Sequence, residues 1–254
     1  MKSLEKFFNP RNTAARKIKR IRRKEYKQGL DLYQQERSGI HYLKWLGGLQ
    51  GTFRYAQGLP SNLVVDIGAG STRGIKSISE QKFAKKFKFK ATVLSINTVN
   101  VSQPDVDNLY STNLKEKIDE NLGLENVHIT SAEALRPFAN NSTAIVLSLY
   151  SLPYCGSPEL AVQNIDRILV PGGIFKGVFP IDMLYALYGE KRLQKFTPLF
   201  EEYQYDIAVH VKNFFQSKIG ILLAIKKDKE RQISAQNVLN EDLNTLDASL
   251  KNFN

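Results

Sequence analysis

The sequence contains a single cysteine, Cys155, and its three histidines lie far apart along the chain. One cysteine excludes an intrachain disulfide and a cysteine-based metal cluster, and scattered histidines give no compact set of metal ligands. We therefore expect a protein without a bound metal, in a reducing, cytoplasmic setting.

Long apolar runs are also absent. No stretch approaches the roughly 20 apolar residues that a helix needs to cross a bilayer, so we expect no membrane span. The N-terminus is rich in lysine and arginine but lacks the apolar segment and small-residue cleavage site of a secretory signal. With 42% hydrophobic and 24% charged residues, the 254-residue chain has the composition of a globular protein with one sizeable core and appendages, or of two small domains.

Positive charge is concentrated at one end of the chain. Residues 1–27 carry eleven Lys/Arg and two Glu, a net +9 out of a total of +11, which leaves only +2 for the rest. This basic arm fits the phosphates of RNA, an anionic membrane surface, or no dedicated partner. Three further regions follow, which we predict as a helical cap at 28–58, a wound α/β core at 59–226, and a frayed or loosely docked polar tail at 227–254.

The core alternates between short apolar runs and helical patterns, which is typical of a wound parallel sheet. The β-branched run at 63–67 predicts a strand buried on both faces. We expect further strands at 92–96, 127–130, 144–148 and 174–179, and a closing antiparallel pair at 205–211 and 220–226. Helices are expected at 73–86, 114–121, 158–168 and 181–195.

The most informative segment is 63–74, which reads LVVDIGAGSTRG. A buried strand runs directly into a loop with three glycines, where the backbone can approach a ligand because no Cβ intervenes. The helix that follows offers amide N–H groups and a positive dipole end to a polar or anionic ligand. The G-x-G-x-x-x-G spacing differs from that of dinucleotide binders, and no Walker lysine follows.

Three segments together resemble class I S-adenosylmethionine-dependent methyltransferases. VVDIGAGSTRG is similar to the first motif of the family, SAEALRPF at 131–138 to its segment after the third strand, and 157–175 to its helix that leads into an R-x-L-x-P-G-G turn. They cover about residues 59–180 in the order of the family. The resemblance implies an α/β, doubly wound, mostly parallel seven-stranded sheet (a Rossmann-like methyltransferase fold) with a helical N-terminal extension, and S-adenosylmethionine as cofactor.

The resemblance also implies roles for the residues at matched positions. The amino-acid part of the cofactor would be surrounded by Asp66, Gly68, Ala69 and Gly70; the ribose would meet Asn97, the adenine Ser131 and Ala132, and the methyl group Ser148 and Leu149. Tyr150 and Tyr154 are the candidate bases for an acceptor that must lose a proton, and the alternative for each is a place in the pocket wall or packing at the sheet edge.

Two matched positions depart from the family. Asn97 stands where an acidic residue usually binds both ribose hydroxyls, and Ser131 stands where an Asp is common beside the adenine. A carboxylate accepts hydroxyl donors more strongly than an amide does, so we expect modest cofactor affinity unless Asp105 or Asp107 compensates.

The sequence therefore predicts a methyltransferase with a small-molecule acceptor. One alternative is an RNA methyltransferase whose basic arm, 1–27, clamps the RNA backbone; another is a catalytically degenerate binding protein with the same fold. The aromatic residues of the helical cap predict either a lid over the substrate or packing on the sheet: Tyr33, Tyr42, Trp45 and Phe53. The tetrad at 151–154, SLPY, resembles the S/N/D-P-P-Y motif of enzymes that methylate amino groups, with Leu at its second position.

Overall fold

The computed structural model describes residues 38–93, 120–181, 186–214, 217–231 and 233–251. The chain divides into two units, Met1–Gln35 and Glu36–Asn254, and every described residue belongs to the second. The basic arm, Asn97, Asp105, Asp107 and most of the helix expected at 114–121 thus lie outside the described residues.

A seven-stranded sheet forms the centre of the described unit, in the order β3-β2-β1-β4-β5-β7-β6. The strands are β1 (Leu63–Ile67), β2 (Lys88–Val93), β3 (Val127–Ile129), β4 (Thr143–Leu149), β5 (Leu169–Pro180), β6 (Tyr205–Phe214) and β7 (Ser217–Lys226). Only β7 runs antiparallel to its neighbours, β5 and β6, whereas the other pairs are parallel. The doubly wound, mostly parallel sheet expected from the sequence is confirmed.

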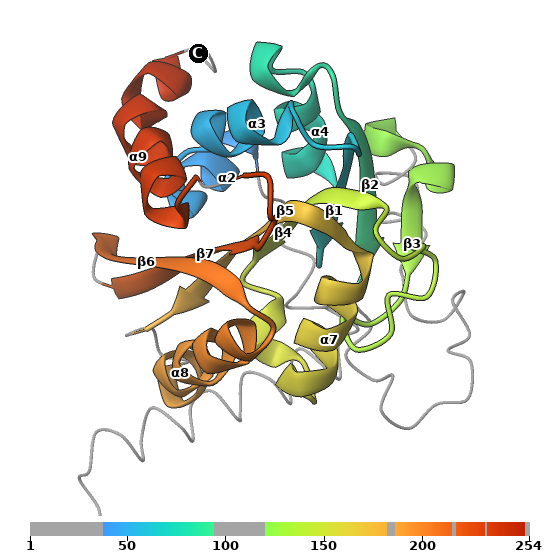
Figure 1. Ribbon diagram of the computed structural model, residues 1–254. Helices are drawn as coiled ribbons and strands as arrows, with labels where there is room; N and C mark the ends of the chain where they lie inside the picture. Colours follow the sequence, from blue (N-terminus) through green and yellow to red (C-terminus); the bar gives the residue numbers. More distant parts are fainter. Residues whose placement is uncertain (1–37, 94–119, 182–185, 215–216, 232, 252–254) are drawn as a thin grey trace, which may run out of the picture. The chain divides into compact units, whose positions relative to one another are not determined.

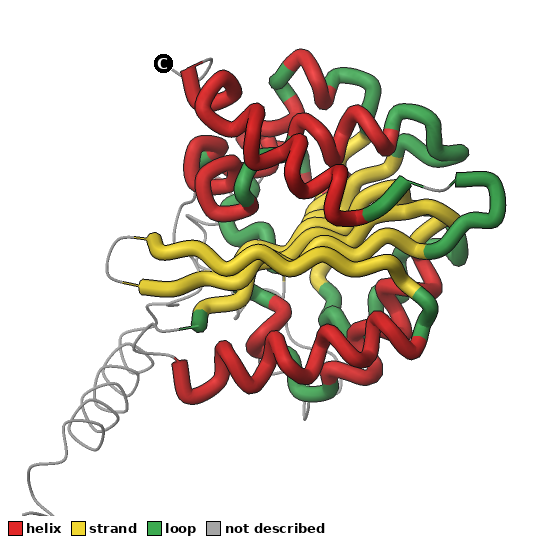
Figure 2. Tube along the Cα trace, turned by 60° about the vertical axis from the view of Figure 1, so that its left-hand side comes forward, coloured by secondary structure: helices red, strands yellow, loops and turns green. Residues whose placement is uncertain are grey.

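Helices cover both faces of the sheet (Figures 1 and 2). One face carries α2 (Gly39–Leu46), α3 (Gln50–Ala56), α4 (Arg73–Ser79) and α9 (Ala235–Lys251), and the other carries α7 (Pro158–Ile168) and α8 (Ala186–Glu202). None of these described helices is long and apolar enough to cross a membrane.

Strand β1 supplies both layers of the core, as its continuous apolar run predicts. Val64 packs into the cluster beneath α2 and α3, while Val65 and Ile67 pack into the cluster beneath α7 and α8. A central parallel strand is buried on both sides because its neighbours and both helical layers enclose it. The polar residue of this strand, Asp66, points to the α2 side and is also fully buried.

Helix α7 begins where its start signals predict. The Ser157 hydroxyl accepts the Leu160 N–H at 3.3 Å, Pro158 occupies the first turn, and Glu159 follows at the positive end of the helix.

Several element boundaries differ from those expected. Strand β2 begins at Lys88, four residues earlier than expected. Its first residues were not recognised as a strand because Lys88 and Lys90 alternate with the buried Phe89 and Ala91, which makes the segment look charged. Strand β5 begins before the Pro-Gly-Gly turn, with an irregular register against β4. Helix α4 ends at Ser79, ahead of a short 3-10 turn, and α8 continues to Glu202, beyond the expected end at 195.

The expectation of a frayed or loosely docked C-terminal tail is wrong for residues 235–251. They form helix α9, which packs on α2 and α3 and buries Val238 and Leu239. The approach of α9 to α3 is close, since a Cβ added at Gly51 would lie 2.9 Å from the Val238 carbonyl oxygen. The division of the chain at 27, 58 and 226 stays a prediction.

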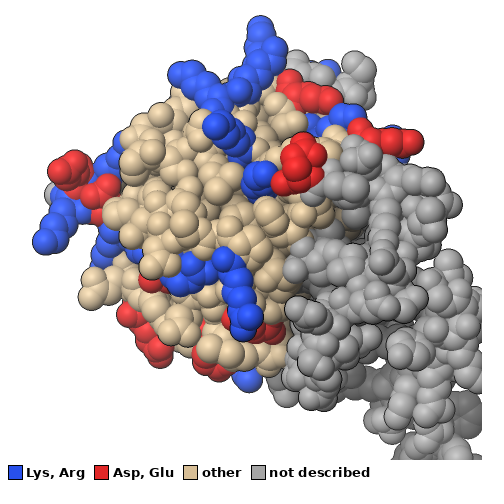
Figure 3. Space-filling view, turned by 90° about the vertical axis from the view of Figure 1, so that its right-hand side faces the viewer, with Lys and Arg blue, Asp and Glu red and all other residues tan. Residues whose placement is uncertain are grey.

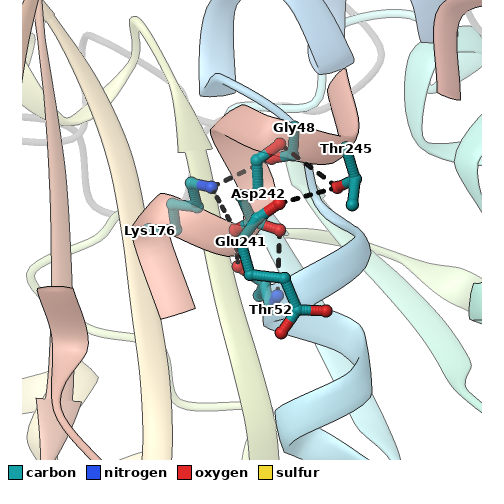
Figure 4. A network of polar contacts seen from close by, with 6 residues as sticks. All are labelled: Gly48, Thr52, Lys176, Glu241, Asp242 and Thr245. Atoms are coloured by element: carbon teal, nitrogen blue, oxygen red, sulfur yellow. Dashed lines mark hydrogen bonds and ion pairs between the residues drawn. The ribbon is translucent and has the colours of Figure 1, made fainter. Parts of the chain in front are cut away.

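A buried ion pair joins α9 to the sheet (Figure 4). Lys176 Nζ of β5 lies 2.6 Å from Asp242 Oδ2 of α9, and both side chains are fully buried. Lys176 also donates to the Gly48 carbonyl at 2.9 Å, while Asp242 accepts the Thr52 N–H at 3.0 Å and the Thr52 hydroxyl. Burial lowers the pKa of Lys176, and the Asp242 carboxylate opposes this by stabilising the ammonium form.

Removing one partner of this pair should strongly destabilise the protein. Asp242→Ala leaves the Lys176 charge buried without its counter-ion, and we expect the free energy of unfolding to fall by about 3–5 kcal/mol. The double variant Lys176→Met/Asp242→Leu should recover most of this loss, because apolar side chains of similar size need no partner. Chemical denaturation of the three proteins measures the difference.

The neighbouring Glu241 provides the matched control. Its ion pair with Arg54, 2.6 Å long, lies at the surface with side chains 32% and 62% exposed, so Glu241→Ala should cost less than about 1 kcal/mol. An Asp242→Ala variant as stable as Glu241→Ala would contradict the role given to the buried pair.

Candidate functional site

The carboxyl ends of β1 and β4 lie side by side at the centre of the sheet, since Ile67 pairs with Ser148 in parallel register. Strand order reverses at this point, because the chain continues from β1 to β2 on one side and returns as β4 on the other. In open α/β sheets, such a switch point forms the crevice that binds a ligand. The segments predicted to contact the cofactor follow these two strands.

The glycine loop after β1 has a backbone that requires glycine. Gly68 has φ 78° and Gly70 has φ 57°, both in the left-handed region that a side chain disfavours. The amides of Gly68 and Ala69 donate to the Thr92 carbonyl of β2 at 2.9 and 3.0 Å. Strand β2 therefore anchors one side of this loop.

Thr72 is a site residue that sequence reasoning missed. It has φ 64°, a strained value for a β-branched residue, and it is fully buried. Its hydroxyl has no hydrogen-bond partner among the residues that the structure describes. Strained backbone and an unsatisfied buried hydroxyl are costly features that cluster at functional sites.

Asp66, at the end of β1, is covered by α2. Its Oδ2 accepts the Tyr42 hydroxyl at 2.5 Å, and Asp66 and Tyr42 are only 0% and 1% exposed. A hydrogen bond to an ionised acceptor is stronger than one between neutral groups. The sequence analysis predicts Asp66 as a site residue and Tyr42 as an aromatic residue of the helical segment 28–58, and the structure brings the two into direct contact.

An aromatic row extends from α2 to the end of β4. The Tyr150 ring packs edge-on against Trp45, with centroids 4.7 Å apart, and Trp45 is followed by His41 at 5.5 Å. Tyr150 has φ 63°, a second strained position beside the glycine loop. Of the two candidate bases, Tyr150 thus lies in this row, whereas the structure describes only the backbone of Tyr154, in a 3-10 turn.

The other residues matched to the family are mostly internal. Leu149 and Ala132 are buried in the core clusters on opposite faces of the sheet. Ser148 is also buried, with its hydroxyl bonded to Ser151 at 2.8 Å. Ser131 is half-buried, and its carbonyl accepts two amides of the turn that follows. Whether these four positions contact a cofactor stays a prediction.

One titratable group lies in the adjoining strand β3. Burial lowers the pKa of His128, and the Lys90 ammonium lowers it further, so the imidazole is neutral at pH 7. Its ring packs edge-on against Phe138 at 5.3 Å. This environment is that of a histidine packed beside an aromatic ring.

The residues at this switch point fit the amino-acid end of S-adenosylmethionine, which carries an ammonium and a carboxylate. The Asp66 carboxylate suits a cationic group, and the Thr72 hydroxyl offers a buried donor next to the left-handed glycines. The loop residues Gly68 and Gly70 would let the ligand approach the backbone.

Tyr42→Phe tests the link between α2 and Asp66. Loss of a hydrogen bond to a buried carboxylate should lower the free energy of unfolding by about 1.5–3 kcal/mol. We also expect S-adenosylhomocysteine to bind about tenfold more weakly, a change of roughly 1.4 kcal/mol, in calorimetric titration. The control is Tyr55→Phe on α3, whose ring faces Arg231, and equal affinities of the two variants would contradict the prediction.

A family model described as a methyltransferase domain matches residues 65–176. No curated protein matches the sequence.

Solved methyltransferase structures resemble the chain. A precorrin-6y C5,15-methyltransferase from Geobacter metallireducens has 18% identity and a TM-score of 0.44, over 69% of this chain and 86% of that one. A SAM-dependent methyltransferase from Aquifex aeolicus has 15% identity and a TM-score of 0.47, over 72% and 92%. Phosphoethanolamine N-methyltransferase 2 from Haemonchus contortus, solved with S-adenosyl-L-methionine, has 15% identity and a TM-score of 0.48, over 72% and 53%.

The matched segment 65–176 runs from the middle of β1, through the glycine loop and β4, into β5. It contains the switch point where Asp66, Gly68 and Gly70 lie, and open α/β sheets bind ligands at such a point. Residues 65–176 therefore match a methyltransferase domain, which is consistent with the class I S-adenosylmethionine-dependent methyltransferase family and with S-adenosylmethionine as the cofactor.

Proposed function

We propose that this protein transfers the methyl group of S-adenosylmethionine to a small-molecule acceptor. The observation that carries the proposal is the cover that α2 forms over the carboxyl ends of β1 and β4. Asp66, Tyr42 and Tyr150 there are at most 8% exposed. Small-molecule sites are concave and largely enclosed by apolar and aromatic side chains, whereas a macromolecular acceptor needs an open approach.

The protein itself would align the acceptor with the methyl group and exclude water from the site. When bound, S-adenosylmethionine supplies an electrophilic methyl group on a sulfonium, so no catalytic side chain is obligatory. The glycine loop and Asp66 would hold the amino-acid end, and Trp45 with Tyr150 would form the wall that orients the acceptor. The Tyr150 or Tyr154 hydroxyl would accept a proton only from an acceptor that must lose one.

The RNA alternative depends on the basic arm, residues 1–27. The described unit has a lysine-rich surface of its own, where Lys82, Lys85, Lys86 and Lys88 are exposed, and Figure 3 shows Lys and Arg side chains along the top of that face. This cluster lies at the amino end of β2, the end opposite the glycine loop. RNA bound on these lysines would not place a base at the cofactor, which favours the small-molecule reading.

Two observations support the alternative of a catalytically degenerate binding protein with the same fold. Asn97 and Ser131 replace two usual acidic contacts, and the Ser131 carbonyl is already bonded within its turn. A protein that binds S-adenosylmethionine and transfers no methyl group to either acceptor class would fit this alternative.

The direct experiment uses the full chain and S-adenosylmethionine labelled in its methyl group. Calorimetry first measures binding of the cofactor, and the label is then followed into a low-molecular-mass metabolite extract and into total RNA. We expect labelled small molecules and unlabelled RNA. Label in RNA that disappears on deletion of residues 1–27 would overturn the proposal.

Trp45→Ala tests the proposed acceptor wall. Truncating an aromatic anchor typically costs more than about 1.4 kcal/mol of binding, so we expect the KM for the acceptor to rise at least about tenfold. The Kd for S-adenosylhomocysteine should stay within about twofold, because the wall is not assigned to the cofactor. Trp45→Phe, which keeps an aromatic ring against Tyr150, serves as the control and should change the KM much less.

A further inference from the structure

The turn that follows β4 contains a chain of three hydrogen bonds with a single direction. The Ser151 hydroxyl donates to the Ile67 carbonyl, and its oxygen lies 2.8 Å from the Ser148 hydroxyl. The Leu152 N–H donates to Ser148 Oγ at 3.1 Å. Each serine has one hydroxyl proton, so Ser151 gives its own to Ile67 and Ser148 gives its own to Ser151.

This series of hydrogen bonds ends at the peptide group that joins Ile67, the last residue of β1, to Gly68, the first residue of the glycine loop. The carbonyl of that peptide belongs to Ile67 and accepts from Ser151, while its N–H belongs to Gly68 and donates to the Thr92 carbonyl at 2.9 Å. One edge of β1 is thus bonded to the turn that follows β4, and the other edge is bonded to β2. Bonds at both ends fix the orientation of the peptide plane, and Gly68 follows it in the left-handed conformation.

These bonds lie in the protein interior, where the pairing of the two strands ends. Ile67 and Ser148 are buried, and β1 and β4 stop pairing at these two residues. A carbonyl oxygen has two lone pairs, so the Ile67 carbonyl can accept from a second donor in addition to its partner in the sheet. Ser151 supplies that donor, so its hydroxyl points into the protein and not toward an acceptor, unlike the role suggested by the resemblance of SLPY to S/N/D-P-P-Y.

We propose that Ser151, supported by Ser148, is a positioning residue for the cofactor. It holds the Ile67–Gly68 peptide in the one orientation from which the left-handed glycine loop continues. The inference rests on the cofactor site at this loop and is independent of the identity of the acceptor. Neither serine needs to touch the cofactor, since each acts through the backbone of the loop.

Ser151→Ala is the central variant, tested in the full chain with S-adenosylhomocysteine as the probe. It removes the donor to Ile67, and we expect the Kd in calorimetric titration to rise about 5- to 30-fold. Ser148→Ala leaves Ser151 able to donate to Ile67, so its effect should be smaller. Ser151→Thr restores a hydroxyl at the same position and should return the affinity to within about threefold of the original protein.

The matched control lies at the other end of the same two strands. Ser61 donates to the Ser142 carbonyl at 2.6 Å and accepts the Leu63 N–H at 3.1 Å, so it ties the amino ends of β1 and β4 together. Ser61→Ala should lower the melting temperature without changing the Kd by more than about twofold. A Kd raised equally in Ser61→Ala and Ser151→Ala would reduce Ser151 to a general stabilising residue and overturn the proposal.

A second readout needs no ligand and separates this proposal from the assignment of the cofactor. Hydrogen exchange of the Gly68 and Ala69 amides should accelerate in Ser151→Ala, while that of Val64 in the middle of β1 should not. Unchanged exchange at Gly68 would overturn the positioning role even in a protein that binds the probe. Accelerated exchange in a protein that binds no probe would support the hydroxyl chain and count against the cofactor site instead.

Discussion

The buried ion pair of Lys176 with Asp242 is the interaction on which the arrangement of the helices above the sheet depends. Two charges removed from water are tolerated only when every donor and acceptor around them is matched. Here the match requires β5, the link between α2 and α3, the first turn of α3, and α9 to meet at one point, since Gly48 of the link and Thr52 of α3 complete the bonding. The C-terminal helix α9 lies outside residues 65–176, which match the family model, but this bonding makes it part of the same folded unit.

Helix α2 connects the ion pair to the candidate cofactor site. This helix ends at the link that carries Gly48, the Lys44 carbonyl near its end accepts from Lys212 of β6, and its Tyr42 covers Asp66. Burial and the nearby Lys176 charge lower the pKa of Lys212 to about 8, so positive charge at this end of α2 varies with pH. A short helix with little stability of its own is thus held by polar bonds from three separate elements.

Local patterns in the sequence account for the features that were predicted correctly. The run LVVDI followed by GAGS specifies a buried strand and a left-handed loop, and Ser157 with Pro158 specifies the start of α7, because each needs only adjacent residues. The start of β2 and the packing of α9 were not predictable in this way. Alternating lysines concealed the strand, and the polar appearance of α9 includes an aspartate whose partner lies 66 residues earlier in the chain.

Gly48 has a consequence for the evolution of this protein. A Cβ at this position would lie 2.1 Å from the Asp242 carbonyl oxygen, and the residue has φ 97°, so no other amino acid is compatible with the present approach of α9. Replacement of this glycine in a descendant would have to displace the C-terminal helix and, with it, the counter-ion of Lys176. Positions 48, 176 and 242 are therefore expected to be inherited as one unit, and their joint occurrence would mark the relatives that share this C-terminal arrangement.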